Sequence, residues 1–131
     1  MILYSAIIVG FGGFFGAASR FLLNSLIQRT TEKIPIGTLV VNTLGCLLLG
    51  FLLAMFVSRS TSTNAYRLLL AVGFIGSFTT FSSFSYENYL LLSNGQWISL
   101  SVNVALNVVG CIMATAAGIL VAKVLTASLT N

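Results

Sequence analysis

The sequence predicts an all-α integral membrane protein with four transmembrane helices, and three observations lead to this fold class. Only 6% of the 131 residues are charged, whereas a soluble domain is about 25% charged. Hydrophobic residues make up 57% of the chain, and the mean hydropathy is +1.04. The apolar stretches reach the roughly 20 residues that a spanning helix needs. Because each unpaired backbone group costs several kcal/mol in lipid, helices are the expected form.

This composition also excludes several function classes. A soluble enzyme and a disordered segment do not fit so apolar a chain, and the net charge of +4 rests on six scattered cations rather than a basic face. We therefore expect no nucleic-acid partner. The chain has no His, which removes the commonest general base and metal ligand, so we expect no enzymatic activity.

The elements follow from the uncharged stretches. Residues 1–19 carry no charge and no basic segment before the apolar run, so the first stretch is expected to be a helix and not a signal peptide. Pro35 is well placed in the first turn of the second helix. Short polar connections leave no room for a second domain, and residues 1–131 are expected to form one. The expected helices cover about 3–27, 36–57, 66–92 and 97–124.

The third helix carries the most informative pattern. Gly73 and Gly76 are followed by six hydroxyl residues within nine positions. Glycine weakens a helix, and Ser and Thr side chains compete for its backbone bonds. We therefore predict a break near residues 76–80, at mid-membrane, where freed carbonyls would suit a desolvated hard cation.

Polar and aromatic groups follow this third helix at regular spacing. A phenyl ring has a positive edge, so a ring presented edge-on can favour an anion without carrying a charge. Intramembrane ionisable groups, here Arg20 and Glu87, are candidates for function. One face of the third helix carries Ser77, Thr80, Ser83 and Glu87, and an adjacent face carries Phe78, Phe81 and Phe84.

The second and fourth helices supply uncharged polar groups. Thr38 and Asn42 lie one turn apart, and the Asn42 amide offers two N–H donors to a small anion. A helix–helix hydrogen bond is the alternative for this amide. A polar stripe on the fourth helix, which must face protein or water, consists of Ser99, Asn103, Asn107, Cys111 and Thr115.

Small residues inside the spans allow close helix packing. Gly12 and Gly16 form a GxxxG pair, and Gly110, Ala114 and Gly118 form a similar stripe. Packing within one chain and packing between two chains explain these residues equally well.

The cations do not define an orientation, which Lys/Arg asymmetry normally sets. Three cations are expected on each side: Arg59, Arg67 and Lys123 with the termini, and Arg20, Arg29 and Lys33 opposite. The balance favours copies that insert in both orientations and pair antiparallel, and a weak signal from few charges is the alternative.

The sequence resembles the Fluc (CrcB) family of fluoride channels over essentially its whole length. The matching segments are GGFFGAASR (12–20), GTLVVNTLGCLLLG (37–50) and GFIGSFTTFSSFSYE (73–87). The third segment is the specific one.

The resemblance implies a passive, fluoride-selective channel in the cell (inner) membrane that exports cytoplasmic fluoride as an antiparallel, dual-topology homodimer. It also implies a structural Na⁺ at the dimer centre, held by backbone carbonyls of Gly76 and Thr79. In such a channel the fluoride pathway would comprise the ring edges of Phe81 and Phe84, the Asn42 amide, the hydroxyls of Thr80, Ser83 and Thr38, and the charged groups of Arg20 and Glu87.

Two positions depart from the family pattern. Ser77 stands where a second glycine is usual, next to the implied cation site, and Cys111 stands where serine is common. Two other functions are weighed against the channel. A small multidrug-resistance transporter needs a carboxylate in its first helix, and this chain has none before Glu32. A non-transporting assembly subunit would not need polar stripes in three helices.

Overall fold

The chain forms four apolar spans, as predicted from the uncharged stretches. The computed structural model describes residues 2–28, 35–58 and 64–129, and its four long helices have the length and hydropathy of membrane spans. The elements are α1 (Ile2–Gln28), α2 (Ile36–Ser58), α3 (Asn64–Tyr66), the π-helix η1 (Arg67–Ile75), α4 (Gly76–Phe78), α5 (Phe81–Ser93) and α6 (Trp97–Leu129).

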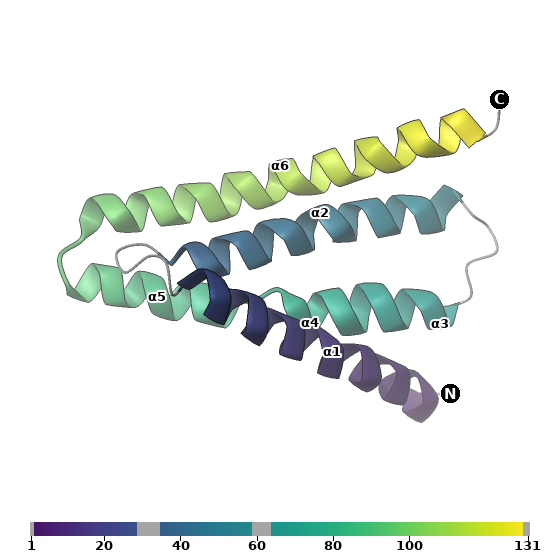
Figure 1. Ribbon diagram of the computed structural model, residues 1–131, viewed down its shortest axis with the longest axis horizontal. Coiled ribbons are helices and arrows are strands. Elements are labelled where there is room, and N and C mark those ends of the chain that lie inside the picture. The colour runs from purple at the N-terminus through teal and green to yellow at the C-terminus, as the bar shows by residue number, and fades with distance from the viewer. Residues whose placement is uncertain (1, 29–34, 59–63, 130–131) are drawn as a thin grey trace.

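The spans pack in two parallel pairs (Figure 1). Elements α3, η1, α4 and α5 follow one another along a single third span, which runs in the same direction as α1. Helices α2 and α6 run the opposite way, side by side. The two ends of the chain lie at the same end of the bundle, as an even number of spans requires.

Glycines hold α1 directly against η1. A Cβ atom on Gly12 would meet the Leu69 carbonyl, and one on Gly16 would meet the Phe74 carbonyl. From the other side, a Cβ on Gly73 would lie 2.7 Å from the Val9 carbonyl oxygen. Only glycine allows the two backbones to approach this closely. The GxxxG pair of the first helix therefore packs within the chain.

Glycines likewise allow α2 and α6 to pack in close contact. A Cβ on Gly50 would meet the Thr115 carbonyl, and one on Gly118 would meet the Leu47 carbonyl. The two helices thus lie in backbone contact around the middle of α2, near Leu47 and Gly50. This close approach determines which side chains of α2 lie opposite which side chains of α6.

The third span is broken near its midpoint, within the predicted segment. Thr79 (φ −77°, ψ 158°) and Thr80 (φ −150°, ψ 117°) are extended, so α4 ends and α5 starts afresh. The π-helix η1 before the break was not expected from the sequence. Such wide turns are found frequently at functional sites.

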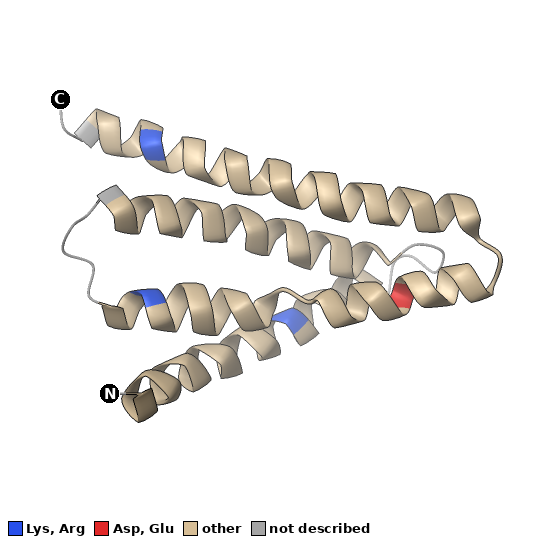
Figure 2. Ribbon diagram, turned by 180° about the vertical axis from the view of Figure 1, so that it is seen from behind, with Lys and Arg blue, Asp and Glu red and all other residues tan. Residues whose placement is uncertain are grey.

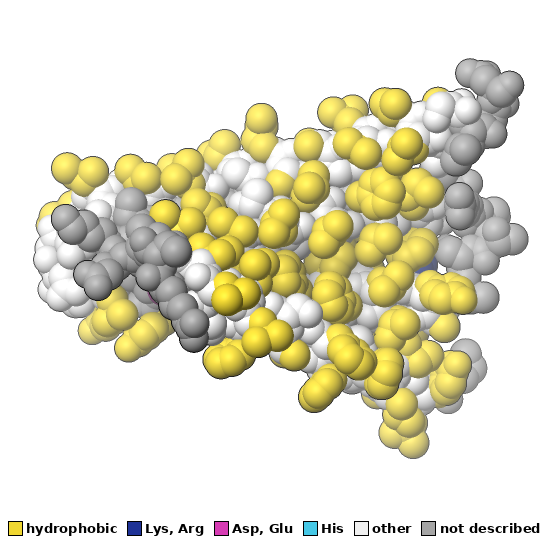
Figure 3. All heavy atoms as spheres, viewed as in Figure 1, with side chains coloured by type: hydrophobic (Ala, Val, Ile, Leu, Met, Phe, Trp, Pro, Cys, Tyr) yellow, Lys and Arg dark blue, Asp and Glu magenta, His cyan; other side chains and the backbone are white. Residues whose placement is uncertain are grey.

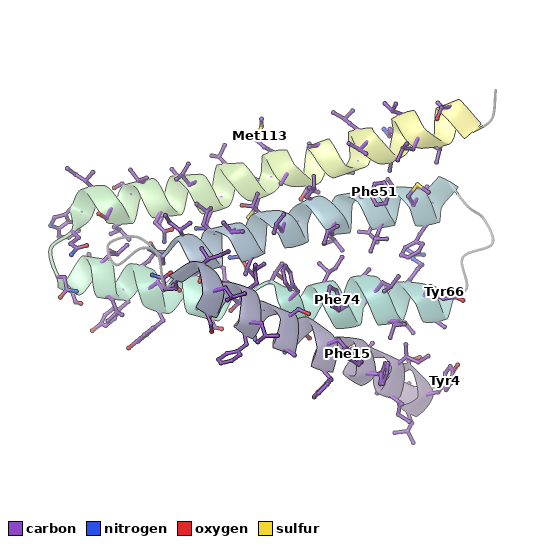
Figure 4. The ribbon with its side chains drawn as sticks, in the orientation of Figure 1. Tyr4, Phe15, Phe51, Tyr66, Phe74 and Met113 are labelled. Atoms are coloured by element: carbon purple, nitrogen blue, oxygen red, sulfur yellow. The ribbon has the colours of Figure 1, made fainter. Side chains whose placement is uncertain are left out.

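The outer surface fits a lipid environment. Apolar side chains cover the face seen in Figure 3, and Met113 points away from the bundle (Figure 4). The amphipathic rings of Tyr4 and Tyr66 lie at one end of the molecule (Figure 4), and Trp97 begins α6 at the other, as is typical of the two membrane interfaces.

Charged residues are few and separated on the described helices (Figure 2). Lys123 lies near the end of α6, and Arg67 begins η1. Arg29, Lys33, Arg59 and Glu32 lie outside the described residues. The predicted balance of three cations on each side therefore stays a prediction.

Candidate functional site

The break in the third span is held by one side-chain amide. The Thr80 N–H donates to Asn42 Oδ1 at 2.8 Å, and Asn42 Nδ2 donates back to the Thr80 carbonyl at 3.1 Å. Asn42 thus pairs with both backbone groups of a residue that has left the helix. Buried backbone groups need such partners, so this amide stabilises the extended conformation.

The break frees the two carbonyls expected at the cation site. In a continuous helix the Gly76 carbonyl would accept from the Thr80 N–H, and the Thr79 carbonyl from the Ser83 N–H. Here the Thr80 N–H donates to Asn42, and the Ser83 N–H donates to Thr80 Oγ1 at 3.2 Å. Both carbonyls are therefore released from the helical ladder.

These two oxygens fit part of a hard-cation site. Carbonyl oxygens are suitable ligands for such ions, which take about six of them. Gly76 is exposed, and the Thr79 carbonyl accepts a hydrogen bond from Arg20 Nη1 at 3.3 Å. Two oxygens from one chain are too few to complete the coordination.

A relay of asparagine amides leads away from the break. Asn42 Nδ2 also donates to Asn107 Oδ1 at 3.3 Å, and Asn107 Nδ2 donates to Asn103 Oδ1 at 3.1 Å. Asn103 Nδ2 donates to Asn88 Oδ1 at 3.0 Å, and Asn88 Nδ2 to the Phe84 carbonyl at 2.8 Å. We call these four residues the asparagine relay. It links α2, α6 and α5 through uncharged groups.

Asn88 is the relay member that sequence reasoning missed. Its position could have been found, because it lies eight residues after Thr80 and four after Phe84, on the same face of α5. The polar stripe of α6, by contrast, did reveal Asn103 and Asn107.

Hydroxyl groups and two rings surround the start of α5. Thr80 Oγ1 lies 3.1 Å from Ser83 Oγ and also caps the helix. The rings of Phe81 and Phe84 are 5.5 Å apart, at 48° to each other. Phe84 is buried, whereas 76% of Phe81 is exposed on the surface of the chain.

Thr80 lies in the lining of two cavities. The first, which we call the ring cavity, has about 260 Å³ and contains both phenylalanines of the pair. The second, the arginine cavity, has about 190 Å³. Both far exceed the roughly 10–15 Å³ that one water requires. The ring cavity is lined by Asn42, Cys46, Thr79, Thr80, Phe81, Phe84, Asn107, Val108 and Cys111.

The arginine cavity gathers most of the remaining candidates. Arg20, Thr38, Thr80 and Ser83 line it, together with Ala17, Phe21, Asn24 and Val41. Asn24 was not a candidate from the sequence; its Oδ1 is buried and has no hydrogen-bond partner among the described residues.

Two candidates lie outside both linings. Glu87 Oε1 accepts a 2.6 Å hydrogen bond from the Thr38 hydroxyl, while its Oε2 is buried without a partner in the part of the chain that is described. Glu87 is thus linked to the arginine cavity by its hydrogen bond with Thr38, which lines that cavity. Gly76 lies on the exposed side of the break.

Comparison with known proteins places this site in a family. The family model described as "CrcB-like protein, Camphor Resistance (CrcB)" matches residues 7–119, a range that includes every candidate residue. The chain belongs to the CrcB family. This confirms the resemblance found in the sequence.

CrcB relatives cover nearly the whole chain. A protein from Legionella pneumophila (strain Lens) is 42% identical over 124 residues, which are 94% of this chain and 92% of its own. One from a Nitratiruptor species is 43% identical over 116 residues, 88% of this chain and 89% of its own. Both are named "Fluoride-specific ion channel FluC". Membership of the CrcB family, whose relatives are named ion channels, and the four spans identify a multi-pass membrane protein of a channel family, and not an enzyme.

Proposed function

We propose that this protein is a passive, fluoride-selective channel that exports cytoplasmic fluoride across the cell membrane. The observation that carries the proposal is the name of the relatives, fluoride-specific ion channel, at 42% identity over 94% of the chain. The geometry at the break supports it, since two cavities that offer uncharged donors, one of them with Arg20 in its wall, share Thr80 there. CrcB membership also disfavours the transporter and the assembly subunit considered from the sequence.

Fluoride would pass between the cavities at Thr80. The Arg20 guanidinium attracts an anion into the arginine cavity, where the hydroxyls of Thr80 and Ser83 replace water one molecule at a time. Hydroxyls and amides bind an anion weakly enough to release it, whereas a full cation in the narrowest part would trap it. Arg20 is itself engaged with the Thr79 carbonyl, which moderates its attraction.

In the ring cavity the proposed ligands are the edges of Phe81 and Phe84 and one N–H of Asn42. Both Nδ2 protons of Asn42 are engaged in this structure, but the bond to Asn107 Oδ1 is the longer of the two, at 3.3 Å against 3.1 Å. A fluoride ion beside the rings would take over this longer bond. The shorter bond would keep holding the Thr80 carbonyl.

The same channel is proposed to be an antiparallel homodimer. Phe81 is 76% exposed, and Gly76, near the middle of the span, is exposed too, so a lone chain would open the ring cavity and the Gly76 carbonyl to lipid. Lipid-exposed backbone groups of this kind are costly. A second copy packed on this face would cover the ring cavity and the exposed backbone.

A structural sodium ion at the dimer centre completes the proposal. The Gly76 and Thr79 carbonyls of two copies would supply four of the roughly six oxygens that a hard cation takes. When bound, the ion supplies a fixed positive charge that joins the two breaks. The freed carbonyls described above are the support for it.

Fluoride efflux from liposomes that contain the purified protein tests the function, with chloride as the control anion. We expect fluoride efflux and no chloride efflux; efflux of neither anion, or equal efflux of both, would overturn the proposal. Phe81→Ile should abolish or cripple fluoride flux. The matched control is Phe14→Ile, because Phe14 is exposed on α1 and lines neither cavity. Equal flux through both variants would refute the role of the ring edge.

A further inference from the structure

Two cysteines, Cys46 and Cys111, occupy matching positions on the paired helices α2 and α6. Asn42 contacts Asn107, 65 positions later, and Gly50 meets Thr115 with the same separation. Midway between these contacts, Cys46 of α2 and Cys111 of α6 are again 65 positions apart, and both line the ring cavity. Both thiols are free and partly buried.

The thiol pair belongs to the wall of the ring cavity. Cys46 and Cys111 line it together with Phe81 and Phe84. The proposed fluoride pathway makes no use of either sulfur. Two adjacent thiols beside a cavity with room for an ion can act together as metal ligands.

The chemistry of this pair favours a soft ion of low coordination number. Thiolates select soft ions such as Cu(I), whereas structural zinc takes four ligands. No group of three or more His, Cys, Asp or Glu side chains occurs among residues 2–28, 35–58 and 64–129. A two-ligand site is therefore what the described helices offer.

We propose that Cys46 and Cys111 form a two-coordinate site for a soft monovalent metal ion, whose binding closes the ring cavity to fluoride. The closure rests on the proposed channel function, whereas the binding does not. On binding, both S–H bonds break, two sulfur–metal bonds form, and both protons leave to water, with no change of oxidation state. The two thiolates and one monovalent cation leave a net charge of −1 in the cavity wall. This negative charge repels an anion that enters the cavity.

Silver(I), in chloride-free nitrate medium, is the probe for the metal site. Reduced protein is loaded with Ag⁺, washed with an excess of a monothiol and analysed for silver by elemental mass spectrometry. We expect about one silver ion per chain in the wild type and a loss of at least about tenfold in Cys46→Ser and in Cys111→Ser. The sequence has two cysteines in all, so the double variant gives the background. Equal retention by the wild type and the double variant would overturn the site.

Fluoride efflux with and without Ag⁺ tests the closure. Each variant is compared with its own flux before silver, and gel filtration confirms that it remains folded. We expect silver to reduce the fluoride flux of the wild type to background, and a dithiol to restore this flux. The flux of the double variant should be unchanged by silver. Silver retained by a wild type that still conducts overturns the closure. A wild type that never conducts fluoride contradicts the channel instead, while silver retention still decides the site.

Discussion

Replacing Asn42 by Ala should lower the free energy of unfolding substantially, because this one side chain stabilises the extended conformation at the break. The substitution removes three hydrogen bonds, two of them to the backbone of Thr80, which is buried. An unpaired buried backbone group costs about 1–3 kcal/mol, so the two groups of Thr80 together cost about 2–6 kcal/mol. Hydrogen bonds between membrane helices average about 0.6 kcal/mol, which sets a lower limit of about 2 kcal/mol for three.

Reversible unfolding in mixed lipid–detergent micelles measures this loss, and fluoride efflux measures its effect on the pathway. Asn94→Ala is the matched control: Asn94 is exposed in the turn after α5, and such changes stay within about 0.5 kcal/mol. We expect flux through Asn42→Ala to fall by more than about tenfold, the factor that corresponds to about 1.4 kcal/mol.

The reasoning fails if Asn42→Ala unfolds within about 0.5 kcal/mol of the wild type. The extended conformation at Thr80 would then be maintained by its neighbours alone. Normal stability together with lost flux would point instead to a direct contact between Asn42 and the ion.

Three further results are expected. Gly16→Ala should cost about 1–3 kcal/mol of unfolding free energy, because its Cβ meets the Phe74 carbonyl; Gly10→Ala, with open space around it, should be neutral or stabilising, and equal losses would contradict the close packing. Thr38→Val removes the donor to Glu87 and should cost about 1–3 kcal/mol, whereas Thr38→Ser should be near wild type in the same unfolding assay. Replacing Na⁺ by N-methylglucamine during purification should make the dimer dissociate more readily on gel filtration, and an unaltered dimer would exclude a structural role for sodium.

The sequence was sufficient to predict the spans and the break. The expected helices 3–27 and 36–57 differ from the observed α1 and α2 by one residue at each end or less, because a run of apolar residues in lipid has no alternative to a helix. The break at Thr79 and Thr80 lies inside the predicted 76–80 segment. Glycine and hydroxyl side chains weaken the helix locally, so the break too follows from local sequence.

The partners across helices could not be predicted in the same way. Periodicity placed Asn42 on a polar face of the second helix, but it could not show that the amide pairs with the backbone of Thr80. Similarly, the spacing placed Phe81 and Phe84 on one face of the third helix, yet Phe81 is exposed and Phe84 is buried. These outcomes depend on which helices pack together and at what depth, and a single chain's pattern does not contain that information.

The shared register of α2 and α6 restricts how this protein can change in evolution. Two contacts along the pair, at Asn42 and Gly50, both connect to residues 65 positions later. One residue inserted within either helix would rotate everything beyond it by about 100° and separate each later contact from its partner. The turn at Gly95, which adopts a positive φ of 69° and has open space around it, can instead absorb a change in length. Insertions and deletions are therefore expected in the connections between spans, while substitutions alone can alter the paired helices.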